Sequence, residues 1–294
     1  MGTGADAQRS HSDEQVCADD DANDIWPGSG NAPLIHTPHR SEKRVITGFS
    51  RRQFLAGLGA CPVCAAAVGA AAAEGAHWTY VDPGNWGTDG RYPACSIGGE
   101  QSPIDLTGAV RAEIEPPAVS WQHQAFSVIN NGHTIQANAS TGGFATSAGR
   151  KYELQQFHFH APSEHTLDGK RSAMEVHFVH GGEGGNLMVI GVFLEGEGQD
   201  ANPAFSALMA AAPKDEGEAA LNAPIDPVWL LPKARHFFRY EGSLTTPPCS
   251  EVVEWNVFAA PVAVAQSDIA RFKESFSMNA RPLQPIHRRV LLTN

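Results

Sequence analysis

The chain has 294 residues, with 29 glycines, 20 prolines and a formal net charge of −11 at pH 7. From Gly75 onward, 15 Lys and Arg stand against 23 Asp and Glu, a net charge of −8. An acidic domain without a basic stripe argues against nucleic acid as a partner. The glycines and prolines punctuate short segments, which is typical of a mostly β protein. About 220 residues suffice for one sizeable core, and all-β domains of that size are commonly single.

The start of the chain differs in composition from the rest. Residues 1–49 are polar and acidic and contain few residues able to form a core, which predicts a disordered extension. Residues 50–74 contain the twin arginines Arg51 and Arg52, then an Ala- and Gly-rich run with a small-residue cleavage site near Ala73. We interpret residues 50–74 as a twin-arginine export signal. The mature protein is then expected to be periplasmic or secreted, without a stable membrane span.

Two other interpretations of this run stay open. The run could be an uncleaved membrane anchor, although Pro62 and three glycines make it weakly apolar. Leu58-Gly59-Ala60-Cys61 resembles a lipoprotein processing site, although the apolar stretch before Cys61 is very short. In each case we expect the folded domain to span residues 75–294.

Two predicted strands carry three histidines. In residues 156–160, apolar and polar side chains alternate, which predicts a half-buried strand. Side chains at i and i+2 of a strand share a face, so His158 and His160 project together while the intervening phenylalanines pack on the other face. Residues 174–179 alternate in the same way and contain His177. If the two strands pair, three imidazoles converge and leave a fourth position open, the ligand set of a catalytic zinc site.

Polar neighbours favour a metal site over a structural one. Gln156 has the parity of His158 and His160, and Glu175 has the parity of His177. A metal-binding histidine usually donates its second N–H to an amide, carboxylate or carbonyl, which fixes the ring and its tautomer. Without such neighbours, a histidine in a strand is more often a satisfied structural residue. A zinc-buffering protein without turnover would favour an exposed histidine-rich loop.

Residues 203–212 are the one clear helical candidate. They are rich in Ala and Leu, and Pro213 closes the run. We expect this helix to pack at the periphery of the sheet, without a chemical role.

Several motifs along the chain stand in a specific order. They are Gln101-Ser102-Pro103-Ile104-Asp105, Asn130-Asn131-Gly132-His133, Gln156–His160, Ser163-Glu164-His165-Thr166, Glu175–His180, Ser243-Leu244-Thr245-Thr246-Pro247-Pro248-Cys249 and Asn279-Ala280-Arg281-Pro282-Leu283-Gln284-Pro285. In order and spacing, this set resembles the α-class carbonic anhydrases of the bacterial exported type. The resemblance covers His77 to Leu292. It implies a mainly β fold, a single domain with a large central, mostly antiparallel twisted sheet and short peripheral helices.

The resemblance also implies a Zn²⁺ enzyme that reversibly hydrates carbon dioxide to bicarbonate and a proton through a zinc-bound hydroxide. The implied zinc ligands are His158, His160 and His177. Their implied hydrogen-bond partners are Gln156, Glu175 and a backbone carbonyl near Asn279. Weak hydrolysis of esters is expected as a side activity, because a zinc hydroxide can attack an activated carbonyl.

Two further residues match positions that orient the hydroxide. Thr245 resembles the threonine that accepts a hydrogen bond from the zinc-bound oxygen and donates its own to a buried carboxylate, and Glu164 matches that carboxylate. An ionised glutamate only accepts, so the threonine must donate to it. Thr246 would contact bicarbonate. The alternative for residues 245–248 is a simple turn restricted by its prolines.

An apolar pocket and a proton path follow from the same resemblance. The residues implied for the carbon dioxide pocket are Val179, Val189, Leu244 and Trp255. His133 matches the histidine that carries protons out of the site, a role that suits a side chain with a pKa near neutral pH; the alternative is a surface histidine beside a turn glycine. The residues that match positions organising water on this path are Tyr80, Asn131 and Gln136. The residues expected to make structural hydrogen bonds are His165 and His180.

Cysteine usage supports export. Of five cysteines, only Cys95 and Cys249 lie after the leader. An even pair in an exported domain favours a disulfide, and bacterial enzymes resembling this chain carry a bridge at these two places. Two free thiols are the alternative. The bond would tether the segment next to Thr245.

Two other functions are compatible with the sequence. An inactive binding module with the same fold would typically lack one or more zinc histidines, whereas all three stand here. A mainly esterolytic hydrolase is a nearer rival that only an assay separates. The expected partners are small molecules, carbon dioxide and bicarbonate, and a homodimer is compatible with the family.

Overall fold

The structure is a computed structural model that describes residues 78–140, 143–197, 202–221 and 223–294. The expected disordered extension and export signal, residues 1–74, lie outside the described residues.

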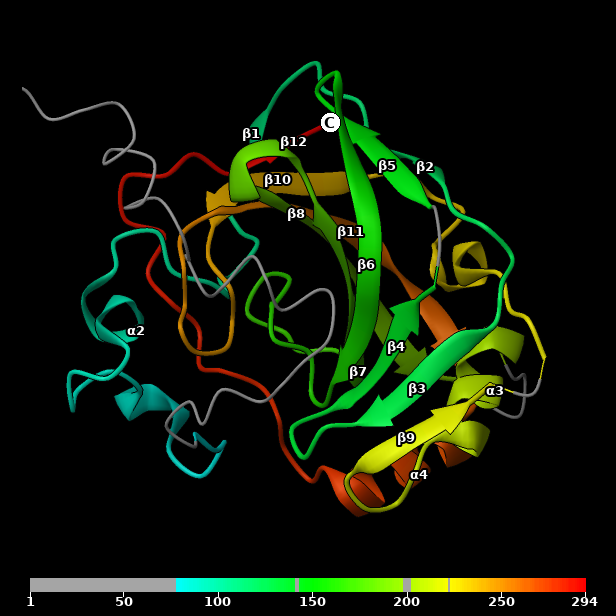
Figure 1. Cartoon of the computed structure of the whole chain (residues 1–294). Helices are drawn as coiled ribbons and strands as arrows, with labels where there is room; N and C mark the ends of the chain where they lie inside the picture. Colours follow the sequence, from blue (N-terminus) through cyan, green and yellow to red (C-terminus); the bar gives the residue numbers. More distant parts are fainter. Residues whose placement is uncertain (1–77, 141–142, 198–201, 222) are drawn as a thin grey trace, which may run out of the picture. The chain divides into compact units, whose positions relative to one another are not determined.

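A twelve-stranded sheet dominates the described part of the chain (Figure 1). The strands follow the order β1-β12-β10-β11-β8-β7-β6-β4-β3-β9, with β5 also paired to β6 and β2 paired to β5. Their bounds are β1 (Val110–Arg111), β2 (Ala118–Ser120), β3 (Phe126–Asn130), β4 (Ile135–Ala139), β5 (Phe144–Ser147), β6 (Arg150–His160), β7 (Met174–Gly181), β8 (Leu187–Gly196), β9 (Gly217–Ala220), β10 (Phe237–Gly242), β11 (Val253–Val264) and β12 (Leu292–Thr293). Only β8 with β11 and β1 with β12 pair in parallel among these strands. The expected large, mostly antiparallel sheet is confirmed.

Short helices accompany the sheet. Their bounds are η1 (Pro83–Asn85), α2 (Pro93–Ile97), η2 (Glu183–Gly185), α3 (Pro203–Ala211), η3 (Pro227–Leu230) and α4 (Gln266–Ser275). The helix expected at residues 203–212 is α3, which ends one residue earlier. Pro203 lies in its first turn, and Asn202 caps it by accepting the N–H groups of Ala204 and Phe205. α3 and α4 contact each other and lie together beside the sheet (Figure 1).

Strand alternation divides the apolar residues between two cores. Phe157 and Phe159 on β6 and Phe178 on β7 are fully buried in the larger core, to which α3 and α4 also contribute. The neighbouring positions, such as Val179, face a smaller core that contains Trp255. The period of two therefore places the phenylalanines and the metal-ligand candidates on opposite faces, as predicted.

A third cluster of buried residues surrounds a disulfide. Cys95 and Cys249, 154 residues apart in sequence, are bonded as expected. Trp78, Tyr80 and Trp86 pack around the bond. In the described ranges, no helix has both the length and the apolar character needed to cross a membrane.

Candidate metal centre

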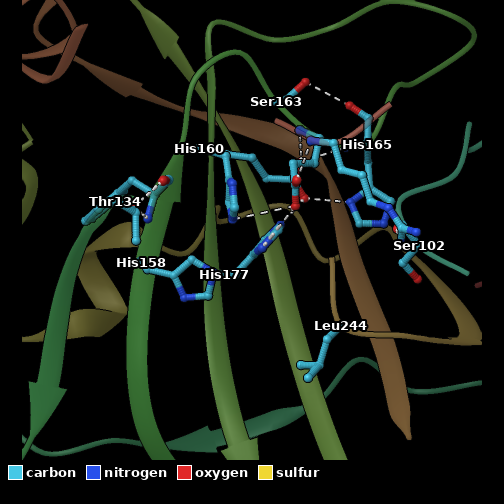
Figure 2. A network of polar contacts seen from close by, with 12 residues as sticks. Ser102, Thr134, His158, His160, Ser163, His165, His177 and Leu244 are labelled. Atoms are coloured by element: carbon cyan, nitrogen blue, oxygen red, sulfur yellow. Dashed lines mark hydrogen bonds and ion pairs between the residues drawn. The ribbon is translucent and has the colours of Figure 1, made fainter. Parts of the chain in front are cut away.

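Three histidines converge where β6 and β7 pair (Figure 2). His158 lies directly opposite His177 in the antiparallel register, and His160 follows on the same face of β6. The ring centroids lie 5.0 Å apart for His158 and His160, 5.4 Å for His158 and His177, and 4.5 Å for His160 and His177. One nitrogen of each ring lies within 4.8 Å of the others. The strand pattern thus brings together the residues that the sequence analysis singled out as ligands.

On β6, each histidine has one nitrogen engaged by an oxygen. His158 Nδ1 lies 2.8 Å from Gln156 Oε1, and His160 Nδ1 lies 2.7 Å from the backbone oxygen of Asn279. Both oxygens are acceptors, so Nδ1 of each ring carries the proton. Nε2 of His158 and Nε2 of His160 therefore keep their lone pairs for another partner.

On β7, Glu175 organises His177. Its Oε1 lies 2.9 Å from His177 Nε2 and 2.8 Å from His165 Nδ1. Its Oε2 accepts the backbone N–H groups of Glu164 and His165 at 2.8 and 2.9 Å. Burial by itself raises the pKa of Glu175, but electrostatic attraction and hydrogen bonds from His165 and His177 bring that pKa well below its ordinary value. In the neutral ring, His177 therefore carries its proton on Nε2 and keeps a lone pair on Nδ1.

Burial keeps the two β6 histidines neutral. Desolvation, and then the neighbouring His160 and His177, lowers the pKa of His158 well below its ordinary value. Desolvation also lowers the pKa of His160, although Glu164 opposes the shift. Neutral imidazole is the form that binds a metal ion.

Glu164 faces the same lone pairs with one free oxygen. Its Oε1 accepts the backbone N–H of Arg281 at 2.8 Å. Its Oε2 lies 3.6 Å from His160 Nε2 and 3.9 Å from His177 Nδ1, and has no hydrogen-bond partner among the described residues. The hydrogen bond expected from the Thr245 hydroxyl to this oxygen is therefore not formed in the structure.

These residues fit a zinc ion. His160 Nε2 is buried without a hydrogen-bond partner in the part of the chain that the structure describes, and such unpaired atoms are costly. With Nε2 of His158 and Nδ1 of His177 it forms a set of three imidazole nitrogens within 4.8 Å of one another, the donor set of catalytic zinc sites. His165, Glu175 and His177 also have metal-like spacing, but they are hydrogen-bonded to one another.

An apolar wall lies beside the histidines. Val179 pairs with Val189, and Val189 pairs with Trp255, so these side chains form one row across β7, β8 and β11. All three residues are buried. The Trp255 ring lies 4.8 Å from the His177 ring, at an interplanar angle of 74°. The row of apolar residues therefore reaches the metal-ligand candidates.

Trp255 also anchors the loop after β10. Its Nε1 donates to the backbone oxygen of Ser243 at 3.0 Å. Leu244 packs against the same apolar cluster, and Thr245 is buried. The backbone oxygen of Thr246 accepts the N–H three residues later, so the segment is also a turn, as the alternative interpretation held.

The turn between β3 and β4 carries His133. Its backbone N–H donates to Asn131 Oδ1 at 3.0 Å, and its ring stacks on Trp78 with centroids 3.8 Å apart and planes 13° apart. Tyr80 packs against the edge of Trp78, at 5.4 Å. Gln136 lies on β4 directly opposite a metal-ligand candidate of β6. Asn131 and His133 thus lie in one turn, Gln136 follows it on β4, and Tyr80 is connected to it through Trp78.

Comparisons with known proteins agree with this geometry. The family described as eukaryotic-type carbonic anhydrase matches residues 81–294. A carbonic anhydrase of Nostoc sp. is 39% identical over 233 residues, covering 76% of this chain and 88% of its own length. One of Pectobacterium carotovorum is 38% identical over 229 residues, covering 76% of this chain and 93% of its own length. The solved α-carbonic anhydrase of Thermovibrio ammonificans, in complex with the inhibitor sulfanilamide, is 42% identical with a TM-score of 0.71, over 74% of this chain and 99% of that one.

This chain belongs to the carbonic anhydrase family. It is therefore an enzyme of a family whose general reaction is the hydration of carbon dioxide. The matches span 88% and 93% of the lengths of these two bacterial relatives, so the similarity applies to the whole described domain.

Two features of this carbonic anhydrase were not predicted from its sequence. Trp78 stacks on the ring of His133. The one sequence signal for this contact is that Trp78 lies in an aromatic-rich segment that ends before residue 87. The side chain of Asn279 makes three hydrogen bonds at the end of β6, whereas sequence analysis anticipated only its backbone oxygen. The motif of residues 279–285 marked the segment, but not which strands it reaches.

Proposed function

We propose that this carbonic anhydrase uses a zinc ion held by His158, His160 and His177 to hydrate carbon dioxide reversibly, giving bicarbonate and a proton. One observation carries the proposal: one nitrogen from each of three imidazoles and one unpartnered oxygen of Glu164 meet at a single site. A structural histidine cluster would instead have its polar atoms satisfied.

The protein holds the ligands in advance of the reaction. His158 and His160 would bind through Nε2 and His177 through Nδ1, and a zinc ion bound there supplies the Lewis acidity that makes water a nucleophile near neutral pH. The oxygen acceptors behind the rings fix their orientation, so the site needs little rearrangement during the reaction.

Glu164 and Thr245 are proposed to orient the attacking oxygen. Ionised Glu164 can only accept, so the Thr245 hydroxyl would donate its proton to Oε2 and keep a lone pair toward the reacting water. Trp255 steadies the loop that carries Thr245 through its bond to Ser243. Thr246, the next residue, would contact the bicarbonate product.

The apolar wall suits a small apolar substrate. We propose that Val179, Val189, Leu244 and Trp255 hold carbon dioxide beside the ligands and exclude competing water. Packing without polar partners favours a molecule that lacks a charge, and it favours release of the charged product.

Each hydration releases a proton that must leave the site. His133 is proposed to accept it on its imidazole and pass it to the solvent, because a histidine gains and loses protons near neutral pH. The residues proposed to orient water between this ring and the ligands are Tyr80, Asn131 and Gln136.

The same site would hydrolyse activated esters weakly, by attack on their carbonyl carbon. We also propose that the enzyme acts after export. The disulfide between Cys95 and Cys249 suits an oxidising compartment, which agrees with the predicted twin-arginine signal at residues 50–74.

The test is stopped-flow carbon dioxide hydration by protein that begins near Glu74, with its zinc content measured. We expect zinc-dependent hydration that falls to background in His158→Ala together with zinc. The matched control is His123→Ala, which removes an exposed histidine bonded to the backbone of Pro224 and should keep full activity. Folded, zinc-loaded protein without hydration would overturn the proposal.

A further inference from the structure

The turn that carries His133 faces the end of the strand that carries the ligands. β4 pairs with β6 from Asn138 and Gln156 to Gln136 and His158, and the described ladder ends there. Continued in the same register, it would place His133 opposite Ala161.

The side chain of Asn279 bridges these two positions. Its Oδ1 accepts the Ala161 N–H at 2.7 Å, and its Nδ2 donates to the backbone oxygens of His133 at 3.0 Å and Phe159 at 2.9 Å. The partner types fix the amide's orientation, because an N–H only donates and a carbonyl only accepts. Asn279 is 1% exposed, so these bonds form in a site shielded from water.

A second side chain secures the same turn. Thr134 Oγ1 donates to the backbone oxygen of Phe159 at 2.5 Å and accepts the Phe159 N–H at 3.2 Å. Phe159 lies between the two β6 ligands in sequence. The turn is therefore fastened to the metal-ligand strand by Thr134 and Asn279, beyond the end of the regular ladder.

An inserted amide sets a wider separation than direct pairing. A backbone N–H bonded to a carbonyl holds nitrogen and oxygen at about 2.9 Å, whereas two hydrogen bonds in series through an amide keep them farther apart. The side chain thus determines how far the His133 turn stands from β6.

We propose that the side chain of Asn279 is a spacer that positions the proton-shuttle turn relative to the zinc ligands. This inference rests on the proposed function, in which His133 exports the proton. We expect this spacing to leave room for water between the His133 ring and the ligands. Asn279 is therefore a positioning residue for proton transfer. Its separate backbone oxygen holds His160, so the two roles can be tested apart.

The main test is the variant Asn279→Ala. Its backbone oxygen still accepts from His160, so zinc content and kcat/KM for hydration should stay within about twofold of the parent. The turn loses its spacer, and kcat in dilute buffer should fall about tenfold, since small displacements of a transfer partner have large rate effects. An imidazole buffer, which carries protons without the turn, should restore kcat.

Two more variants separate positioning from general damage. Asn256→Ala removes another fully buried amide, which bonds to Arg239 and Glu254 away from the turn, and should leave the ratio of kcat to kcat/KM unchanged. Thr134→Val removes the second fastening and should lower kcat in the same buffer-dependent way, though less. If Asn279→Ala does not fold, Thr134→Val provides the test of the spacer.

A measurement without metal completes the test. In zinc-free protein, stacking on Trp78 should shift the NMR signals of the His133 ring protons upfield. Asn279→Ala should reduce that shift, and Asn256→Ala should not.

The outcomes are distinct. A buffer-dependent loss of kcat with a reduced ring shift supports the spacer. Unchanged kcat, or a parallel fall of kcat and kcat/KM that Asn256→Ala reproduces, overturns it. If the parent protein shows no hydration at all, the proposed function fails, and the ring shift alone then supports or overturns the spacer.

Discussion

Two buried carboxylates flank the same three histidines, and they differ in how completely they are paired. Glu175 accepts from two imidazoles and two backbone N–H groups, so both of its oxygens are engaged twice. Glu164 accepts one backbone N–H, and its other oxygen has no partner in the described ranges. Both side chains are fully buried.

The difference separates a supporting region from a reacting one. Four donors spread the charge of Glu175, which holds His177 in one orientation and leaves no atom for other chemistry. An unpaired buried acceptor costs about 1–3 kcal/mol, so the free oxygen of Glu164 lowers the stability locally but keeps an acceptor beside His160 and His177. Substitution of Glu164 should therefore impair mainly the hydration reaction, and substitution of Glu175 should impair mainly zinc binding.

The largest effect is expected for Glu164→Gln. Glutamine keeps the shape and an acceptor for the Arg281 N–H, but it cannot act as the ionised acceptor for Thr245. We expect kcat/KM for hydration to fall about 100- to 1000-fold, the range found when one orienting group of a reaction centre is removed. Stopped-flow hydration measures this, and zinc content should be unchanged. Near-normal hydration by Glu164→Gln would remove Glu164 from the reacting region.

A smaller and different effect is expected for Glu175→Gln. The variant removes the charge behind His177 and places an NH₂ group among four donors. We expect zinc affinity to fall about 10- to 100-fold, the usual cost of changing a residue that orients a metal ligand. Competition with a zinc chelator measures it. At saturating zinc, the hydration rate should fall far less than in Glu164→Gln, and the opposite ranking would contradict the comparison.

The same difference in hydrogen bonding separates the buried histidines. The smallest predicted effect is the pH dependence of stability that His180 causes. On the packed face of β7, His180 Nε2 accepts from Trp121 Nε1 at 3.0 Å, and Nδ1 donates to the backbone oxygen of Met188 at 3.3 Å. Burial lowers the pKa of His180 from 6.5 to about 4. Both nitrogens are satisfied, whereas Nε2 of His160 has no hydrogen-bond partner among the described residues.

The sign of the pH effect follows from this shift. Between pH 4 and 6.5 the unfolded chain binds the His180 proton and the folded chain does not, so stability falls as the pH drops through this window. Lowering the pH from 7.5 to 5.5 should cost about 1 kcal/mol through this group. Urea unfolding of metal-free protein at both pH values measures the loss, and His180→Gln should lack this share of it. Equal losses in both proteins would contradict the assignment.

Features that depend on local alternation and motif order could be predicted from the sequence. Period two placed His158, His160 and His177 on one face and the phenylalanines on the other, and the α-class resemblance supplied Val189 and Trp255 as pocket residues. Side-chain direction in a strand depends on parity alone, so these expectations needed no knowledge of distant contacts.

What could not be predicted depends on contacts between distant segments. The Asn279 side chain meets Ala161 and His133 across 118 and 146 residues of sequence. The stack of Trp78 on His133, and the absence of a Thr245 partner for Glu164, likewise arise from packing that no local pattern encodes. The proposed spacer therefore emerged only from the structure.

The most direct test of the central claim is a zinc titration of metal-free protein, followed by stopped-flow carbon dioxide hydration at each step. We predict that the rate rises in proportion to bound zinc and levels off at one zinc ion per chain. If one zinc ion binds at the three histidines and hydration stays at background, the histidine cluster is a metal site without the proposed reaction.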